Sequence, residues 1–416
     1  MVGLCVARAL ARRGEAVSVV EAGPVGGGAS LGNGGWVSPS LAAPLPAPGV
    51  VRRALRWTFE RDAPARLDLR LRPELWRWCW RFARACEPRR FEAGMRALLG
   101  LNADAVRLYR EMAGEGLRIE MRSDGLLYVA RTKASLDHYR HDFEEMRRLG
   151  YGGEVESFDR VALLREEPAL SPALVGGLLA RGDATVRPEA VTAALAADLR
   201  ERGAAVHERR RVRAVHRDHG GWVLATDAGE LRGERVVLAA GSRLAELAKG
   251  LGVTLPLQPG KGYSLTGPGR GERPRHALYL TEALVGATPF GGALRIVGDL
   301  HLGSDDTAVA PRAAERLARR FGPYLRDWRP EGCEPWAGLR PFVPDGLPLI
   351  GALPGCPGAF VAGAHGMLGV TLAPATGAAL AESILDGRSR LDLAPFRVER
   401  FARRQQLLRG PARQRK

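Results

Sequence analysis

The first twenty residues combine two hydrophobic periods. From Val2 to Arg13 apolar residues recur every three or four positions, which predicts a helix, and Gly14 follows as a stop signal. The run from Ala16 to Val20 then predicts a buried strand, and the acidic Glu21 comes directly after it. A helix, a turn and a strand ended by an acid form the later part of a dinucleotide-binding βαβ unit, where the acid accepts hydrogen bonds from a ribose.

The glycine fingerprint of such a unit is incomplete in this sequence. Gly3 stands where the third glycine of G-x-G-x-x-G belongs, while the first two glycines and their strand are absent ahead of it. We therefore expect the polypeptide to begin late, and a strand ending in Gly-x-Gly to precede Gly3 in the complete chain.

The same patterns continue along the chain. Proline in a first turn and glycine at an end predict a helix over 188–202, and periodicity predicts another over 98–112. Short apolar runs predict strands within 118–130 and over 205–208, 212–215, 222–226 and 235–240.

This order predicts an α/β fold with two parts. We expect a Rossmann-like domain for the cofactor and a discontinuous α+β substrate domain inserted into it. The cofactor domain is assigned residues 1–40, 171–250 and 335–395. The substrate domain is assigned residues 41–170 and 251–334, and residues 396–416 are expected to form a basic tail.

Composition narrows the class of protein. A chain of 416 residues with 45% hydrophobic content has the size of a two-domain enzyme. Its formal charge of +16 comes almost entirely from arginines scattered along the chain, with only four lysines. Since no basic block alternates with aromatic residues, nucleic-acid binding is not expected.

Cysteines and apolar runs indicate the compartment. The five cysteines are odd in number and form no C-x-x-C pair, so neither a disulfide framework nor a metal site is expected, and the default compartment is the reducing cytoplasm. The uncharged run over 363–381 contains glycines, His365 and Pro374, which fit a cofactor loop and a buried helix better than a membrane span.

The most informative chemistry lies near the C-terminus. Arg340 stands in Gly-Leu-Arg-Pro, and a Gly-rich turn over 364–369 opens an apolar helix. Backbone N–H groups at a helix start form a positive surface that a ligand can approach closely. An electron-accepting ring that gains negative charge needs such a surface, and a flavin fits this description.

Several segments resemble one family of enzymes over most of the chain. They are Gly-Gly-Gly-Ala-Ser-Leu-Gly-Asn-Gly-Gly-Trp-Val-Ser-Pro (26–39), Ala-Pro-Gly-Val (47–50), Lys-Gly-Tyr-Ser-Leu-Thr (261–266), Pro-Asp-Gly-Leu-Pro-Leu-Ile-Gly (344–351) and Ala-His-Gly-Met-Leu-Gly-Val-Thr (364–371). Together they resemble the FAD-dependent D-amino acid dehydrogenases, within the superfamily of D-amino acid oxidase and glycine oxidase.

The resemblance implies an activity and its partners. FAD is the implied cofactor, and a D-amino acid is oxidised to a 2-oxo acid and ammonia by hydride transfer to the flavin. A membrane quinone or another electron-transfer acceptor, rather than oxygen, then takes the electrons, which places the enzyme in the cytoplasm or at the inner face of the cytoplasmic membrane.

Two alternatives stay open at this stage. A glycine or sarcosine oxidase shares the architecture and Arg340 but uses oxygen; Met367 stands where glycine oxidases carry an arginine, which favours the dehydrogenase branch. The second alternative is an inactive remnant, because a chain that lacks its first strand also lacks the phosphate-binding turn.

The resemblance also implies the site residues. Arg340 is expected to bind the substrate carboxylate through two parallel bonds. Lys261 and Tyr263 point to one face of a strand and are expected either to act in catalysis or to support the residues that do. The cofactor-binding residues are Gly3, Glu21, Ala22, Ala29, Ser30, Asn33, Gly34, Gly35, Val212, Gly241, His365, Gly366, Met367, Leu368, Gly369, Val370 and Thr371.

An arginine-rich aromatic segment remains outside these roles. Trp76, Trp78, Trp80 and Phe82 alternate with arginines. The segment fits a helix that dips into a membrane interface as a peripheral contact, and it fits a buried helix of the substrate domain equally well.

Overall fold

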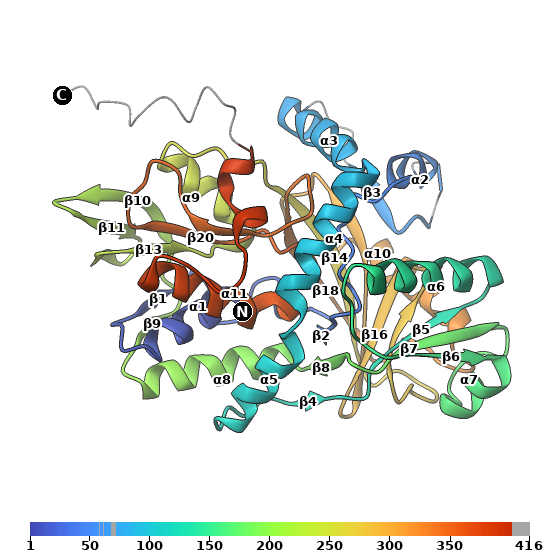
Figure 1. The fold of residues 1–416 in the computed structure, drawn as a ribbon. Helices are drawn as coiled ribbons and strands as arrows, with labels where there is room; N and C mark the ends of the chain where they lie inside the picture. The colour runs from blue at the N-terminus through green and yellow to red at the C-terminus, as the bar shows by residue number, and fades with distance from the viewer. Residues whose placement is uncertain (58, 61, 68–71, 402–416) are drawn as a thin grey trace.

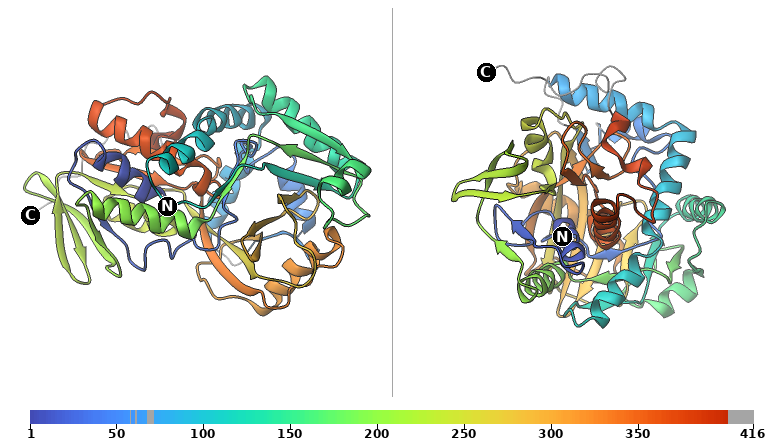
Figure 2. Two further views of the ribbon diagram at one scale, coloured as in Figure 1. Left: turned by 90° about the horizontal axis from the view of Figure 1, so that it is seen from below. Right: turned by 60° about the vertical axis from the view of Figure 1, so that its left-hand side comes forward.

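The structure, a computed structural model, describes residues 1–57, 59–60, 62–67 and 72–401. Figure 1 shows two parts: a large sheet with its helices, and a group of smaller sheets around the helices near the N-terminus. The left view of Figure 2 separates these parts most clearly. The mixed α/β architecture confirms the predicted fold class.

The N-terminal elements follow the hydrophobic pattern. Helix α1 (Val2–Ala11) ends before Gly14, whose φ of 86° suits glycine, and leads into strand β1 (Ser18–Val20). Strand β1 pairs in parallel with β9 (Ala205–His207), which follows helix α8 (Pro188–Glu201). The elements predicted here are thus confirmed within about two residues at each end, the usual uncertainty of helix and strand limits.

A second small sheet carries the C-terminal part of the cofactor side. Strand β20 (Ala359–Gly363) pairs in parallel with β13 (Val236–Leu238) and antiparallel with β19 (Leu349–Ala352). The described strands β1–β9 and β13–β20–β19 form two separate sheets. The strand expected ahead of Gly3 stays a prediction.

Helix α11 (Gly369–Asp386) crosses α1 at close range. A Cβ atom on Gly377 would lie 2.6 Å from the backbone of Cys5, so only glycine permits this approach. The two helices therefore hold the small sheets in one body. An antiparallel meander borders them, formed by β10 (Val212–Asp218), β11 (Gly221–Thr226) and β12 (Gly229–Gly233), together with α9 (Leu244–Gly250).

The large sheet has nine strands. Their order is β18 (Glu334–Phe342), β14 (Gln258–Gly267), β17 (Ala293–Leu302), β16 (Val285–Phe290), β15 (Ala277–Leu280), β5 (Leu126–Ala130), β7 (Gly176–Ala180) and β6 (Val155–Asp159), with β3 (Ala65–Leu67) paired to β17. Helices α6 (Lys133–Arg148), α7 (Arg160–Glu166) and α10 (Pro311–Phe321) pack against it.

Two features differ from the sequence-based expectations. Strands β7 and β18 pair within the large sheet, although they lie in the ranges 171–250 and 335–395 that we assigned to the cofactor domain. The single helix expected over 98–112 is two helices, α4 (Pro88–Asn102) and α5 (Ala105–Gly114). Asparagine and aspartate, which favour helix ends, stand at the break.

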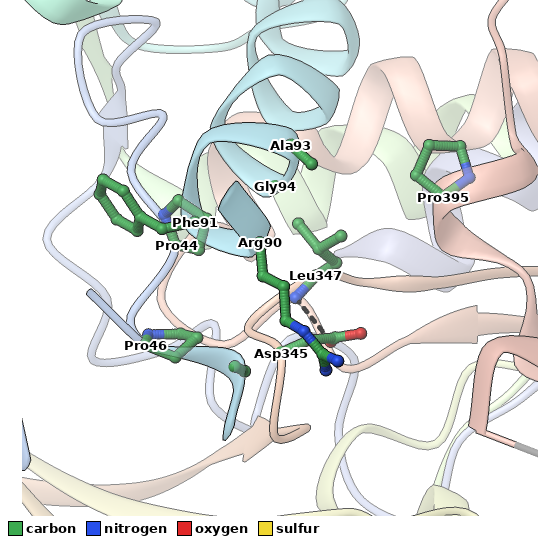
Figure 3. A pocket seen from close by; sticks show the side chains of 10 residues that line it. Pro44, Pro46, Arg90, Phe91, Ala93, Gly94, Asp345, Leu347 and Pro395 are labelled. Atoms are coloured by element: carbon green, nitrogen blue, oxygen red, sulfur yellow. Dashed lines mark hydrogen bonds between the residues drawn. The ribbon is translucent and has the colours of Figure 1, made fainter. Parts of the chain in front are cut away.

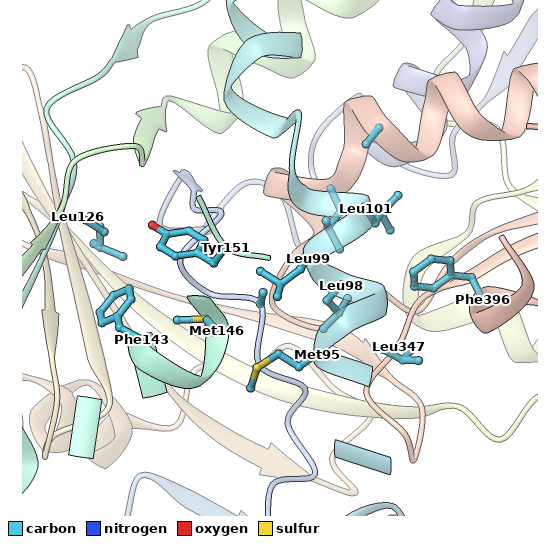
Figure 4. Packing of buried hydrophobic residues seen from close by; sticks show 14 of the residues in the cluster. Met95, Leu98, Leu99, Leu101, Leu126, Phe143, Met146, Tyr151, Leu347 and Phe396 are labelled. Atoms are coloured by element: carbon cyan, nitrogen blue, oxygen red, sulfur yellow. The ribbon is translucent and has the colours of Figure 1, made fainter. Parts of the chain in front are cut away.

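Helix α4 joins the two parts through a shared core. Figure 4 shows Met95, Leu98 and Leu99 of α4 between Phe143 on one side and Phe396 on the other. Leu98 is fully buried in this cluster, which contains residues from both parts of the molecule.

Short strands and two outlying helices complete the fold. Strand β8 (Ala184–Val186) pairs with β2 (Trp36–Val37) and β4 (Met121–Arg122). Helices α2 (Val50–Trp57) and α3 (Pro73–Ala85) extend away from the sheets (Figure 1). No helix of the described residues has the length and apolar character needed to cross a membrane.

A buried ion pair joins the end of α7 to the start of β15. Glu167 is fully buried, and its Oε2 atom accepts the backbone N–H groups of Arg275 at 2.7 Å and His276 at 2.9 Å. The His276 ring lies 3.1 Å from Glu167 and 3.3 Å from Glu166. The hydrogen bond to Glu167 raises the pKa of His276 above its ordinary value.

Stability is therefore expected to depend on the charge of His276. Because its folded pKa is raised, the protonated ring stabilises the fold at low pH, and this contribution is lost as pH rises through the folded pKa. Melting temperatures measured from about pH 6 to about pH 9 should fall with pH in the unmodified protein and fall less in His276→Gln. The exposed His141→Gln is the control, and equal slopes in all three proteins would contradict the assignment.

Candidate active site

Arg340 lies on β18, opposite Gly260 of β14. Its Nη1 atom donates to the backbone oxygen of Asp299 at 2.9 Å, which is its only hydrogen bond to a described residue. Burial lowers the pKa of Arg340 to about 10, so the guanidinium stays charged at neutral pH. A partly buried cation with unused N–H groups is a binding site for an anion.

Gly262 makes room for this guanidinium. A Cβ atom on Gly262 would lie 2.3 Å from Cζ of Arg340, so the arginine rests directly on the backbone of β14. Only glycine permits that approach. Gly262 was not among the predicted site residues, although it stands between two that were.

Asp299 fixes the position of Arg340 from the other side. The register between β14 and β17 shifts beside Gly262, and Asp299 adopts a φ of 61°, which is unusual for a residue with a side chain. Its buried carboxylate pairs with Arg320 and, at 3.5 Å, with Arg316, both on α10. Two guanidinium groups thus share this carboxylate, while Arg340 bonds only the backbone oxygen of Asp299 and keeps its charge for an anionic group.

Lys261 and Tyr263 lie on the opposite face of β14 from Arg340. They flank Gly262, and strand side chains alternate between faces. Nζ of Lys261 is 2.7 Å from Asp306 and 5.7 Å from the centre of the Tyr263 ring, so the two residues share a face, as their spacing predicts.

That face belongs to the core beneath α10. Tyr263 is 4% exposed and packs among Leu317 and Phe321. The structure therefore does not bring Lys261 and Tyr263 together with Arg340. This geometry favours the alternative expected for both, a supporting role, and their direct catalytic role stays a prediction.

Ser264 does share the face of Arg340. It lies two residues beyond Gly262, is 1% exposed, and its Oγ atom has no hydrogen-bond partner among the described residues. A buried hydroxyl without a partner is the kind of group that a bound ligand satisfies. Alternation along 261–266 is the sequence signal that pairs Ser264 with Gly262.

The turn between β20 and α11 is bound to the strand of Arg340. The Gly366 N–H donates to the backbone oxygen of Pro341 at 3.0 Å. Ala364 and Gly366 have positive φ angles of 58° and 56°, so the turn reverses sharply before the helix. Met367 on this turn is 51% exposed.

His365 is buried within the same turn. Its Nε2 atom lies 2.9 Å from Oγ1 of Thr376, and burial lowers the pKa of His365 to about 3. The ring is therefore neutral at physiological pH. Its bond to Thr376 of α11 indicates that it holds the turn in shape.

Thr371 connects the first turn of α11 to β2. Its hydroxyl donates to the Trp36 oxygen at 2.8 Å and accepts the Ser38 N–H at 3.3 Å. The Val370 oxygen accepts the Tyr109 hydroxyl at 2.8 Å. The predicted residues from Leu368 to Thr371 thus form the buried start of the helix.

The loop of Asn33, Gly34 and Gly35 is pinned through its backbone. Asn33 accepts the Gly35 N–H at 2.8 Å through its side chain and Arg295 at 3.0 Å through its main-chain oxygen. The Gly34 oxygen accepts the Thr288 hydroxyl at 2.7 Å. A Cβ atom on Gly35 would lie 2.1 Å from a main-chain oxygen of β8, so glycine is required there.

The nucleotide end of the site lies around α1. A Cβ atom on Gly3 would lie 3.1 Å from Ala239, at the end of β13, and one carboxylate oxygen of Glu21 accepts the Gly23 N–H at 3.1 Å. Its other oxygen has no partner among the described residues, which leaves an acceptor for a donor such as a ribose hydroxyl. The remaining predicted residues lie on a surface segment (Ala22, Ala29, Ser30), at the start of β10 (Val212) and in the turn after β13 (Gly241).

These residues fit FAD. Helix α1 presents N–H groups at its start, Glu21 offers a free oxygen, and Ser264 offers a free hydroxyl.

A separate pocket of about 320 Å³ contains none of the predicted site residues. It lies between α4 and the loops around Pro44 and Leu347, and Figure 3 shows its mainly apolar lining.

Comparisons with known proteins identify the class. The family model described as FAD dependent oxidoreductase matches residues 1–383. The chain belongs to this family, and FAD is its cofactor.

Individual proteins similar to this chain are dehydrogenases and an oxidase of amino acids. The chain is 32% identical over 417 residues to a D-amino acid dehydrogenase of Methylobacterium sp. (strain 4-46), covering 97% of each chain. It is 34% identical to the D-amino acid dehydrogenase of Methylobacterium nodulans (strain LMG 21967 / CNCM I-2342 / ORS 2060), covering 94% of each. The crystal structure of glycine oxidase from Geobacillus kaustophilus superimposes with a TM-score of 0.77 at 25% identity, over 97% of this chain and 96% of that one.

A methyl group at Gly262 should displace Arg340. In Gly262→Ala the added Cβ clashes with the guanidinium, and a displacement of about 1 Å typically costs a rate factor on the order of a hundredfold. We expect kcat/KM for amino acid substrates to fall by that order while bound FAD, measured by absorbance, is unchanged. Gly100→Ala on α4, where a Cβ meets open space, is the matched control; unaltered kinetics in Gly262→Ala would refute the close approach.

Proposed function

We propose that the protein catalyses the oxidative deamination of D-amino acids. The observation that carries this proposal is Arg340, a charged guanidinium with unused N–H groups beside Gly262 and Ser264. The similar proteins named D-amino acid dehydrogenase supply the substrate class. An assay with matched D and L amino acids and an artificial dye acceptor tests it; oxidation of the L forms alone would refute it.

The residues of the chain bind and orient the substrate. Arg340 takes the carboxylate through two parallel bonds, which fixes the rotation of the α-carbon as well as its distance. The carbonyl of Asp299 and the backbone of Gly262 keep the guanidinium from turning. FAD, when bound, supplies the acceptor for the hydride that leaves the α-carbon. The resulting imino acid hydrolyses to a 2-oxo acid and ammonia.

In this scheme the main contribution of the protein to catalysis is to orient the substrate. Hydride loss from a neutral amine requires no strong general base, only a fixed geometry and an electron acceptor. His365 is neutral and bonded to Thr376, which supports a structural role for it rather than proton transfer.

The proposed electron acceptor is a quinone. The name dehydrogenase of the similar proteins and the methionine at position 367 support an acceptor other than oxygen. A quinone lies in the membrane, so we place the enzyme in the cytoplasm, in contact with the inner face of the cytoplasmic membrane.

A glycine or sarcosine oxidase is the second candidate. The similarity to the glycine oxidase of Geobacillus kaustophilus favours it. Oxygen consumption and peroxide release with D-alanine, glycine and sarcosine distinguish the two: stoichiometric peroxide from glycine or sarcosine would support the oxidase instead.

Replacing the fork of Arg340 by a point charge should weaken substrate binding. In Arg340→Lys one of the two parallel bonds is lost, at a cost of about 2 kcal/mol, so KM should rise roughly thirtyfold while FAD stays bound. Steady-state kinetics with D-alanine measure the effect. An unchanged KM would remove Arg340 from the carboxylate role.

Glu21 is expected to act on the cofactor alone. Glu21→Ala removes the carboxylate oxygen that is free to accept from a ribose, so FAD should dissociate more readily, with an affinity loss of roughly tenfold. Flavin released on dilution, measured by fluorescence, gives the loss, and KM for substrate at saturating FAD should be unchanged. Full retention of FAD would contradict the role.

A further inference from the structure

Large apolar side chains are exposed on α2, just beyond its end at Phe59, and on α3. Leu55 is 63% exposed, Phe59 90%, Trp76 46% and Trp80 59%, and Val51 is exposed as well. Elsewhere in the described chain, exposed side chains of this kind occur singly, at Leu31, Val161, Val175 and Met367. Single exposed apolar residues are ordinary, whereas a cluster marks an interaction surface.

Helical spacing sorts these residues to the outside. On α3, Trp76 and Trp80 are one turn apart on one face, while Leu75 and Trp78 of the inner face are buried. On α2, Val51 and Leu55 have the same spacing, and that helix buries no residue. Figure 1 shows both helices at one end of the molecule, away from the small sheets. We call these five exposed residues (Val51, Leu55, Phe59, Trp76, Trp80) the apolar patch.

Positive charge surrounds the patch. The two helices carry six arginines and a single acid, Glu74. The arginines are Arg52, Arg53, Arg56, Arg77, Arg81 and Arg84. None of the six forms an ion pair with another described residue, and Arg84 lies 4.8 Å from the centre of the Trp80 ring. Arg53 interacts electrostatically with the Asp142 carboxylate, and the other five guanidinium groups are available to phosphates.

We propose that the apolar patch and its arginines rest on the surface of a bilayer that contains anionic phospholipids. Tryptophan prefers the level of the headgroups, leucine and phenylalanine enter the acyl boundary, and arginines keep their charge at the phosphates. The inference deepens the proposed function, because a membrane-bound electron acceptor requires contact with the bilayer. It rests on the exposed side chains themselves, independently of the substrate.

A second copy of the chain fits this surface less well. In a symmetric contact each patch meets itself, so six arginines would face six, and like charges oppose that association. An anionic lipid surface supplies the complementary charge. The patch thus combines the two signals that stable peripheral binding requires, apolar insertion and a basic cluster.

Vesicle sedimentation tests the proposal. The full-length flavoprotein is mixed with vesicles of phosphatidylcholine and with vesicles of phosphatidylcholine and phosphatidylglycerol in equal parts. We expect it to pellet with the anionic vesicles and to be released by high salt. The double variant Trp76→Ser/Trp80→Ser should lose roughly tenfold in partitioning, whereas the matched control Val161→Ser/Val175→Ser, exposed on another face, should not.

A charge variant separates the two signals. Arg77→Gln/Arg84→Gln should lose roughly tenfold or more of the preference for anionic over neutral vesicles, because two of the six basic groups are removed. Equal binding of the tryptophan variant and the parent, or no binding of the parent to anionic vesicles, would overturn the proposal. A dimer in sedimentation velocity that the tryptophan variant abolishes would overturn it in favour of self-association.

An activity assay distinguishes failure of the membrane proposal from failure of the proposed function. Dye-linked oxidation of D-amino acids without vesicles should be the same in the parent and both double variants. Vesicle binding without any such oxidation would refute the proposed function and leave the membrane surface intact. Oxidation without vesicle binding would do the reverse.

Discussion

The site depends on keeping one guanidinium charged and unneutralised inside the protein. A buried arginine is costly unless its N–H groups find acceptors, and a carboxylate of the protein in direct contact would compete with an anionic substrate. Here Arg340 donates one hydrogen bond to the backbone carbonyl of Asp299, whose carboxylate is turned away toward Arg316 and Arg320. The backbone carbonyl of Asp299 thus accepts from Arg340, while its carboxylate pairs with the arginines of α10.

Contacts through backbone atoms hold the cofactor and substrate sides together. The loop of Asn33 and Gly34 is bonded to the large sheet through Arg295 and Thr288, and Thr371 binds the chain at Trp36. Glycine at positions 34 and 35 lets the chain pack this closely against β17 and β8. Helix α4 adds a shared apolar core, so the two parts behave as one packed unit.

Much of the fold and part of the site were predictable from the sequence, because local periodicity carries that information. The helix at 188–202 and the alternation of Lys261 with Tyr263 are such cases. Which face of β14 meets Arg340 was not predictable, since it depends on pairing between strands far apart in sequence and on a register shift beside Asp299. The same non-local pairing places β18 in the large sheet. It also directs the Tyr263 side chain into the hydrophobic core beneath α10.

The bond from Gly366 to Pro341 has a consequence for protein engineering. Strand β18 belongs to the large sheet by hydrogen bonding, yet it runs directly in sequence into β19, β20 and the turn that opens α11. The arginine proposed to bind the carboxylate and the turn proposed to meet the cofactor therefore lie on one continuous segment, from Gly338 to Thr371. A chimera that exchanges only 41–170 and 251–334 with a relative would replace Gly262 and Ser264 and keep that segment whole. Grafts that preserve a glycine at 262 are consequently the ones in which a new specificity and the original carboxylate anchor are compatible.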